Sequence, residues 1–318
     1  MSRNERPPRG AALLVAMVLL TVVATLASGM VWQQWKGVQV EAAERSRAQT
    51  GWILQGALDW SRLILREDAR SGQATTLNEP WATPLAEARL STFLAIDSEH
   101  NSDEGEQAFL AGAIQDAQSR YNLRNLVVDG KVAPAELDKL QRLCASAGVG
   151  ADIGTLLAGG LLASSGTGAA ENTGDSNAPL APQQLADLAW FGLDNATIVR
   201  LSAVLVLLPV ATPVNLNTAS REVLAGVITG LDLGGADRLV QARQRQPFRS
   251  LADATAVLGR NVTLEARDVG VKSAFFEVSG RLRLAQRVLS ETTLVERRGS
   301  LEVVAIQHQR QAGLSPAR

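Results

Sequence analysis

The chain has 318 residues, and its 31 lysine and arginine residues against 32 acidic residues give a formal net charge of −1. This balance argues against a protein that coats nucleic acid, which needs a clear basic excess. One cysteine excludes an intramolecular disulfide framework and a cysteine-rich zinc module, and two histidines leave little material for a catalytic triad. The composition indicates an ordered globular protein that is not a conventional enzyme.

The amino terminus begins with a short basic leader. Residues 1–10 carry three arginines, and two prolines oppose a helix there. An uncharged run follows from Ala11 to Val31, long enough to cross a hydrocarbon core, which takes about 20 apolar residues as a helix. Arginines before this run and none directly after it predict a cytoplasmic N-terminus and a chain that lies mostly beyond the membrane.

Three interpretations of the apolar run compete. A secretory signal peptide has an apolar region of roughly 7–15 residues, and this run is longer. An ordinary uncleaved anchor is the simplest alternative. Gly10, directly before the run, resembles the end of the leader of type IV pilins and pseudopilins, which a prepilin peptidase cuts on the cytoplasmic face. That resemblance implies cleavage between Gly10 and Ala11 and allows N-methylation of Ala11.

A departure from the general pilin pattern narrows the choice among pilin-like families. Most pilins carry glutamate at the fifth mature position, where Val15 stands in this chain. A charged side chain at membrane depth costs about 3 kcal/mol or more unless it is paired. Because it lacks this glutamate, the chain resembles the K-type minor pseudopilins of the type II (general) secretion pathway.

The pattern beyond the apolar run predicts a pilin-like core. Trp52, Trp60 and Leu63 recur at helical spacing, so we expect one spine helix from Ala11 to about Arg70. Two helices broken near Gly51 are the alternative. Near the C-terminus, alternating residues predict strands at 276–284, 287–296 and 300–308, which form an antiparallel meander.

The middle of the chain has helical patterns instead. These patterns lie at 136–144, 183–191, 195–207, 220–229 and 236–244. Residues 163–182 have no periodicity and are rich in small and polar residues, which predicts a mobile loop. The expected fold class is α+β, with a long N-terminal transmembrane helix packed on an antiparallel sheet, as in type IV pilins, and an inserted all-helical domain.

These sequence patterns predict six parts of the chain. They are a leader (1–10), a transmembrane segment (11–31), the first part of the core (32–129), the helical insert (130–268), the C-terminal core strands (269–312) and a tail (313–318).

Two further stretches, QDAQSRYNLRNL (Gln115–Leu126) and PVNLNTASREVL (Pro213–Leu224), are similar to the K-type family. The resemblance implies a non-enzymatic subunit of the pseudopilus tip that supports export of folded proteins across the outer membrane. It implies a single-pass protein of the bacterial inner membrane with most of its chain in the periplasm. The implied partners are I-type and J-type minor pseudopilins, the H-type and major pseudopilins, the prepilin peptidase and the inner-membrane assembly platform. A minor pilin of a type IV pilus remains an alternative.

The second stretch also supports a rival function. PVNLNTAS followed by two helices is similar to the helix-hairpin-helix of competence-type DNA receptors, which bind a phosphate through a Gly-hydrophobic-Gly hairpin. Here the hairpin falls at Gly230-Leu231-Asp232, and the aspartate in place of the second glycine would repel a phosphate. We therefore expect no nucleic acid partner, although Gly234-Gly235 leaves a displaced site open.

The remaining candidates are weaker. The acidic residues Asp97, Glu99, Asp103 and Glu104 crowd one loop, and oxygen ligands at alternating spacing suit calcium. Calcium is the cofactor that the K-type resemblance allows, and a solvated acidic loop is the alternative. Cys144 lies on an apolar helical face, which predicts a buried thiol and not a nucleophile.

Overall fold

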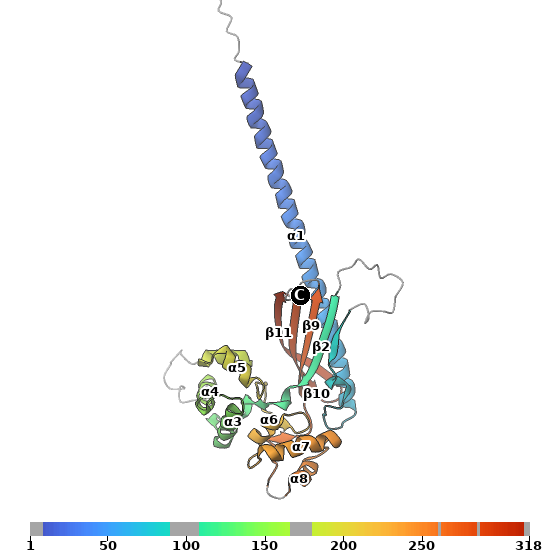
Figure 1. The fold of residues 1–318 in the computed structure, drawn as a ribbon, viewed down its shortest axis with the longest axis vertical. Coiled ribbons are helices and arrows are strands. Elements are labelled where there is room, and N and C mark those ends of the chain that lie inside the picture. The colour runs from blue at the N-terminus through green and yellow to red at the C-terminus, as the bar shows by residue number, and fades with distance from the viewer. Residues whose placement is uncertain (1–8, 90–107, 166–179, 260–261, 285–286, 315–318) are drawn as a thin grey trace, which may run out of the picture. The chain divides into compact units, whose positions relative to one another are not determined.

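The computed structural model describes residues 9–89, 108–165, 180–259, 262–284 and 287–314. The chain divides into two compact units, Met1–Gly56 and Ala57–Arg318. Helix α1 (Arg9–Arg70) forms the first unit and continues into the second without a break at Gly51, which confirms the single spine helix (Figure 1). Gly72 follows the helix with a φ of +64°, the left-handed conformation in which many helices end.

Five strands among the described residues form an antiparallel sheet in the second unit, in the order β1-β2-β9-β10-β11. The strands are β1 (Leu85–Arg89), β2 (Ala108–Asp116), β9 (Phe275–Leu284), β10 (Arg287–Arg298) and β11 (Glu302–Leu314). β9, β10 and β11 form the C-terminal meander that the alternating sequence pattern predicts.

The last turns of α1 pack on this sheet. The buried cluster between them contains Leu58, Leu65, Trp81, Phe276, Val278, Val295 and Val303. The Trp81 indole meets the Phe276 ring edge-on, with ring centroids 5.2 Å apart. Because burial of one such side chain stabilises a fold by about 1.5–3 kcal/mol, the cluster attaches the end of the spine helix firmly to the sheet.

The turn between β10 and β11 lies slightly later than the sequence predicts. Arg297 and Arg298 belong to β10, and Gly299 follows with a φ of +63°. Arg297 is held in the strand because its Nη1 lies 2.6 Å from Asp68 Oδ2 of α1, and both side chains are largely buried. The sequence pattern shows the charge of Arg297 but not this distant partner.

A helical insert separates two strands that are neighbours in the sheet. β2 ends at Asp116 and β9 begins at Phe275, and Asp116 is the register partner of Phe276. The chain therefore leaves the sheet and returns to it at adjacent positions. The helices of the insert are η3 (Ala117–Ser119), η4 (Leu123–Leu126), α3 (Pro134–Ser146), α4 (Ala151–Ser164), η6 (Leu185–Phe191), α5 (Asn195–Leu201), α6 (Arg221–Val227), α7 (Leu233–Arg245) and α8 (Leu251–Leu258). Its short strands are β3 (Tyr121–Asn122), β4 (Val127–Val128), β5 (Lys131–Val132), β6 (Leu205–Val206), β7 (Val214–Asn215) and β8 (Val269–Gly270).

The insert has a hydrophobic core of its own. Leu140, Leu143 and Cys144 of α3 are fully buried in a cluster that reaches from Tyr121 to Val269. Helices α3 and α6 approach closely at Gly226, where a Cβ atom would lie 2.5 Å from Leu143 Cδ2. With α1 and the sheet, this separate core confirms the predicted fold class, a pilin-like α+β fold with an inserted, mainly helical domain.

Most helices predicted in the middle of the chain are present, η6 as a 3-10 helix. The helix predicted at 195–207 is wrong in its second half, since α5 ends at Leu201 and Leu205 pairs with Tyr121 of β3. Residues 203–207 are all apolar, and periodicity cannot distinguish a short buried strand from a buried helix.

The predicted loop at 163–182 falls largely on residues 166–179, which lie outside the described residues. At its beginning the prediction is wrong, because Ala163 and Ser164 belong to α4. The boundaries of the insert at residues 130 and 268 stay predictions, while the sheet connections lie at Asp116 and Phe275.

Candidate functional site

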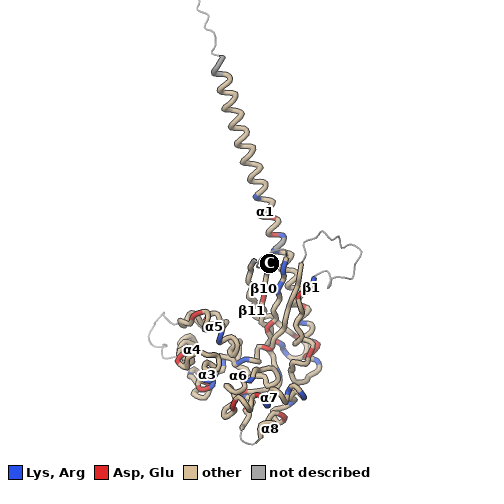
Figure 2. The backbone as a smooth tube through the Cα atoms, in the orientation of Figure 1, with Lys and Arg blue, Asp and Glu red and all other residues tan. Residues whose placement is uncertain are grey.

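The first half of α1 has an apolar surface. Among the described residues, α1 is long and apolar enough to cross a membrane, and an 18-residue stretch of it has a mean hydropathy of 2.4. No charged residue stands between Ala12 and Trp35, a stretch that is tan in Figure 2. The Thr21 and Thr25 hydroxyls donate to carbonyl oxygens one turn earlier at 2.8 and 2.9 Å, so these polar groups are satisfied within the helix.

The predicted processing residues lie at the beginning of α1. The helix begins at Arg9, so the backbone of Gly10 and Ala11 is helical, while residues 1–8 lie outside the described part. The Val15 side chain is 58% exposed within this chain. Cleavage between Gly10 and Ala11 stays a prediction, as does the role of Val15.

An aromatic pair follows the apolar run. Trp32 and Trp35 stack with their ring centroids 5.4 Å apart, and Lys36 Nζ lies 5.7 Å from the Trp32 ring. Tryptophan rings beside a cation, at the end of an apolar helix, are typical of a membrane–water interface.

The predicted calcium site cannot be placed. Its candidates Asp97, Glu99, Asp103 and Glu104 fall within residues 90–107, outside the described part of the chain. Across the residues that the structure does describe, there is no group of three or more His, Cys, Asp or Glu side chains that could hold a metal ion.

A buried polar cluster, termed here the junction network, joins the sheet to the insert at Asp116. The Asp116 Oδ2 atom accepts hydrogen bonds from the hydroxyls of Thr218 and Ser273, both at 2.6 Å. It also accepts from Asn215 Nδ2 at 3.0 Å, and Oδ1 accepts from the Gln118 N–H at 2.8 Å. Burial is the larger effect and raises the pKa of the Asp116 carboxyl, while the hydrogen bonds from these donors lower it. The donors therefore offset part of the cost of burying the carboxylate.

The junction network extends to the end of α1. Asn215 Nδ2 donates to the Thr75 carbonyl at 3.2 Å. Arg297 Nη2 donates to Thr75 Oγ1 at 2.8 Å and to the Ser273 carbonyl at 2.7 Å, while its Nη1 pairs with Asp68. Because these residues come from separate segments, the network ties the last turn of α1, the sheet and the insert together.

Other asparagines hold the insert together by binding backbone groups. Asn217 Oδ1 accepts a hydrogen bond from the Phe248 N–H, and Asn217 Nδ2 donates one to the Phe248 carbonyl, both at 2.9 Å. Asn125 makes the equivalent pair of bonds to the backbone of Thr212, at 2.9 and 3.0 Å. Asn122 donates to the Val210 carbonyl at 2.7 Å. An amide side chain can satisfy a backbone donor and acceptor at once, which explains why asparagine recurs in these stretches.

A second buried cluster closes the insert. Lys139 Nζ, on a side chain 2% exposed, lies 2.8 Å from Glu136 Oε1 and 2.6 Å from Asp268 Oδ1. The Tyr121 hydroxyl donates to Glu136 Oε2 at 2.8 Å, and burial together with this carboxylate raises the pKa of Tyr121. The cluster joins α3 to the segment after α8.

Cys144 lies in the apolar core beside this cluster. Burial raises the pKa of its thiol to about 11, so the thiol stays protonated. This confirms the predicted buried thiol, because a reactive cysteine needs a thiolate and access to solvent.

The hairpin between α6 and α7 has no free helix terminus for a phosphate. Gly230 has a φ of +79°, as a tight hairpin requires, but Asp232 is the N-cap of α7 and its Oδ1 accepts from the Gly235 N–H at 2.7 Å. The aspartate carboxylate therefore occupies the position that a bound phosphate would need. Arg243 is turned inward, where Nη1 donates to the Leu216 carbonyl at 2.6 Å and burial lowers its pKa to about 10.

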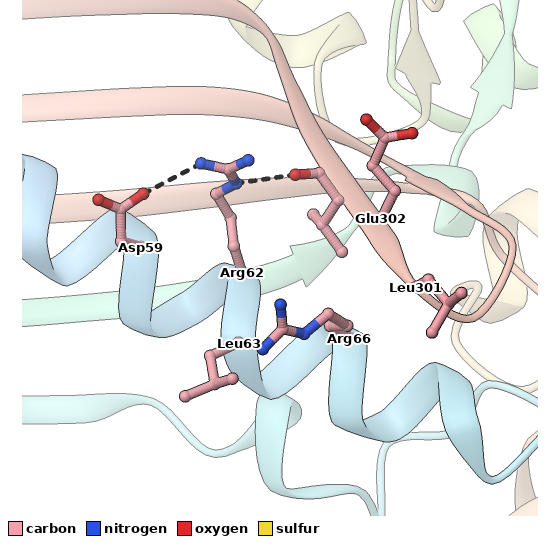
Figure 3. A pocket seen from close by; sticks show the side chains of 7 residues that line it. Asp59, Arg62, Leu63, Arg66, Leu301 and Glu302 are labelled. Atoms are coloured by element: carbon pink, nitrogen blue, oxygen red, sulfur yellow. Dashed lines mark hydrogen bonds and ion pairs between the residues drawn. The ribbon is translucent and has the colours of Figure 1, made fainter.

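Figure 3 shows an open groove on the second unit, between the last turns of α1 and the β10–β11 turn. Its volume is about 460 Å³, and it is lined by Asp59, Arg62, Leu63, Arg66, Leu301, Glu302 and Val303. Arg62 Nε donates to the Val303 carbonyl at 2.8 Å, and Arg62 Nη1 lies 3.0 Å from Asp59 Oδ1. The Arg66 Nε atom is buried and has no hydrogen-bond partner among the described residues.

Comparison with known proteins shows what the chain is similar to. The family model for the type II secretion system (T2SS), protein K, matches residues 214–269. Type II secretion system protein K of Pseudomonas aeruginosa strain PAO1 is 28% identical, over 95% of this chain and 93% of its own length. Over nearly its whole length the chain is thus similar to type II secretion system protein K. The matched segment begins in β7 and ends in β8, so it contains Asn215, Thr218 and the hydrogen bonds between Asn217 and Phe248.

The fold is similar to that of a solved structure. A chain in the crystal structure of the GspK-GspI-GspJ complex from enterotoxigenic Escherichia coli has a TM-score of 0.62 and 17% identity. The match covers 85% of this chain and 98% of that chain. At this identity the likeness concerns the fold, and the helical insert in a pilin-like core is the shared architecture.

Proposed function

We propose that the chain is the K-type subunit at the tip of a type II secretion pseudopilus, where it supports export of folded proteins across the outer membrane. The observation that carries the proposal is the combination of two features in one chain. The first half of α1 carries no charge from Ala12 to Trp35, and the segment that matches the protein K family model lies in an insert between β2 and β9.

The spine helix would act as membrane anchor before assembly and as the fibre contact afterwards. The part of this helix that lies in the first unit exposes apolar side chains, which a bilayer or neighbouring spine helices can cover. The proposed topology has a cytoplasmic N-terminus, one crossing of the inner membrane and the second unit in the periplasm. A prepilin peptidase would cut between Gly10 and Ala11, with N-methylation of Ala11 as a further modification.

The insert would make the subunit suitable for the tip. It adds a helical body with its own core to the pilin fold, and this bulk would discourage addition of another subunit above it. I-type and J-type minor pseudopilins are the proposed direct partners. The H-type and major pseudopilins and the inner-membrane assembly platform are the proposed partners further along the fibre.

The first test is the intact mass of the membrane-bound protein, expressed with and without a prepilin peptidase. We expect a peptidase-dependent loss of Met1–Gly10. A Gly10→Val variant serves as the control that should keep the full mass in both samples. Equal full-length masses for the unmutated chain would contradict the pseudopilin proposal and favour an ordinary anchor.

The second test is isolation of the processed chain with I-type and J-type pseudopilins of the same bacterium. We expect the three to co-purify from detergent-solubilised membranes. Recovery of the chain without either partner, after correct processing, would exclude a place in the tip complex.

A further inference from the structure

The groove between α1 and the β10–β11 turn contains a cation without an acceptor. Arg66 forms no ion pair within the described part of the chain, and its buried Nε has no hydrogen-bond partner. A buried donor left unsatisfied costs about 1–3 kcal/mol, so this feature persists at the expense of stability in the isolated subunit. Arg66 also lines the open groove, so its guanidinium can receive an acceptor from outside the chain.

The other charges of the groove do not meet this need. Asp59 Oδ1 is paired with Arg62 Nη1 at 3.0 Å, and Arg62 Nε is bound to the Val303 carbonyl. Glu302 lies on the opposite wall, and in Figure 3 its carboxylate points away from Arg66. The groove therefore presents one uncompensated guanidinium, whose planar fork suits a carboxylate.

The borders of the groove are apolar. Leu63 is 45% exposed and Leu301 is 71% exposed, one on α1 and the other on the β10–β11 turn. Trp60, one helical turn before Leu63, is 56% exposed. Arginine and tryptophan are enriched where proteins bind each other, and exposed leucines around a partly buried cation offer contacts that exclude water.

We propose that this groove receives an aspartate or glutamate side chain, next to an apolar side chain, from a partner pseudopilin. The carboxylate binds Arg66, and the apolar neighbour packs between Leu63 and Leu301. The inference rests on the proposed function for the class of partner. A protein is favoured over a lipid headgroup because the groove residues begin at Asp59, far along the sequence from the apolar run that ends at Val31.

The test is the Arg66→Gln variant of the full-length chain, which keeps a polar side chain with an apolar stem and removes its charge. We expect its affinity for the purified I-type and J-type pair to fall about tenfold, the loss typical of one charge-assisted hydrogen bond. We expect the Tm of the free variant to be no lower, because the lost group has no partner in the free chain. This pairing of weaker assembly with undiminished stability is what a purely structural arginine would not produce.

Arg70→Gln is the matched control. Arg70 lies one turn later on the same helix, and Nη1 is paired with Glu67 Oε2 at 2.8 Å on the surface. We expect this variant to bind the partner pair like the unmutated chain. Leu301→Asp is an independent second variant, since a carboxylate on this exposed border would compete for Arg66, and it too should weaken binding.

Three outcomes would overturn the proposal. Equal affinity of the Arg66→Gln and unmutated chains would show that the guanidinium receives no partner carboxylate. A lower Tm for Arg66→Gln would assign the side chain to folding. Loss of binding to phosphatidylglycerol vesicles, with partner affinity unchanged, would assign the groove to lipid. If the unmutated chain fails to bind the I-type and J-type pair, the proposed function fails, a result distinct from failure of the groove alone.

Discussion

Leucine has opposite surroundings in the apolar run of α1 and in the core of the insert. In the apolar run Leu20 is 72% exposed, whereas Leu157 and Leu188 in the core of the insert are completely buried. Burial of apolar surface contributes about 25 cal/mol per Å², so the insert gains this stabilisation within its own chain. The apolar run of α1 must gain this stabilisation from a bilayer or from other helices.

This contrast separates folding from assembly. The insert has a hydrophobic core of its own, and the buried Asp116 and Lys139 groups have polar partners within the chain, so changes inside it are expected to affect the stability of the isolated subunit. The apolar run of α1 exposes its side chains within this chain, so changes there are expected to affect insertion and assembly while the second unit stays folded. The predictions below test that separation, from the largest effect to the smallest.

The largest effect is expected inside the insert. Lys139→Ala removes the cation between Glu136 and Asp268 and leaves the buried Glu136 carboxylate without an ion-pair partner among the described residues. Removal of one partner from a buried ion pair costs about 3–5 kcal/mol. Urea unfolding of the full-length chain in detergent measures this loss, and Lys131→Ala, at an exposed position, is the matched control. Equal midpoints for the two variants would mean that the buried charges do not stabilise the insert.

A change in the first unit should act on assembly instead. Val15→Glu places a carboxylate in the apolar run, at a cost of about 3 kcal/mol at membrane depth. We expect impaired secretion in cells, with the Tm of the second unit unchanged. Val15→Leu is the control and should secrete normally. Normal secretion by Val15→Glu would contradict the view that this position must stay uncharged in a tip subunit.

The next prediction concerns slow alkylation of the buried Cys144 thiol. With its pKa raised to about 11 from an ordinary value of 9.0, the thiolate at pH 8 is about 100-fold rarer than in the unfolded chain. We expect alkylation by iodoacetamide to be slowed at least that much in the native protein. The unfolded state loses this proton at a lower pH than the folded state, so the contribution of Cys144 to stability falls as the pH rises from 9 to 11.

Rapid native alkylation of Cys144 at pH 8 would show that the core of the insert opens readily. Alkylation in urea supplies the unprotected rate for comparison. Because the chain has one cysteine, the mass of the labelled protein reports this site alone.

The smallest effect is expected at the α6–α7 hairpin. Asp232→Gly restores a Gly-Leu-Gly hairpin and removes the N-cap of α7, at a cost of a few tenths of a kcal/mol. We expect neither the unmutated chain nor the variant to bind a DNA duplex more tightly than about 1 µM at physiological salt. Fluorescence anisotropy measures this affinity. Tight binding by the unmutated chain would restore the DNA-receptor interpretation.

The sequence is informative where structure depends on local pattern. The spine helix and strands β9 and β10 follow from periodicities of 3.6 and 2, and both are visible in short windows. The turn at Gly299 and the end of α1 before Gly72 follow from the backbone preferences of glycine. These elements could be predicted because their determinants lie within a few residues.

The junction network could not be predicted in this way. Asp116 bonds to Asn215, 99 positions away, and to Ser273, 157 positions away. No window of sequence contains such partners, and polar residues alone do not reveal that they are buried. The resemblance to a family pointed to the stretches that contain Asp116 and Asn215, but not to the bond between them.

Helix α4 shows a different obstacle. Its Gly159-Gly160 pair disfavours a helix by about 1 kcal/mol for each glycine. Gly160 is explained by packing, because a Cβ atom there would lie 2.7 Å from the Phe191 ring. Local propensity argues against the helix, and a tertiary contact from η6 overrides it.

The position of the insert has a consequence for the order of folding. Strands β2 and β9 pair at Asp116 and Phe276, so their pairing must close a loop that contains the entire insert. The entropy of loop closure rises with the length of flexible chain, and such distant contacts form slowly. An insert that folds first brings its two ends together through Asn215 and Ser273, which both bind Asp116. The core sheet is thus expected to form late, with the folded insert acting as a short connection between β2 and β9.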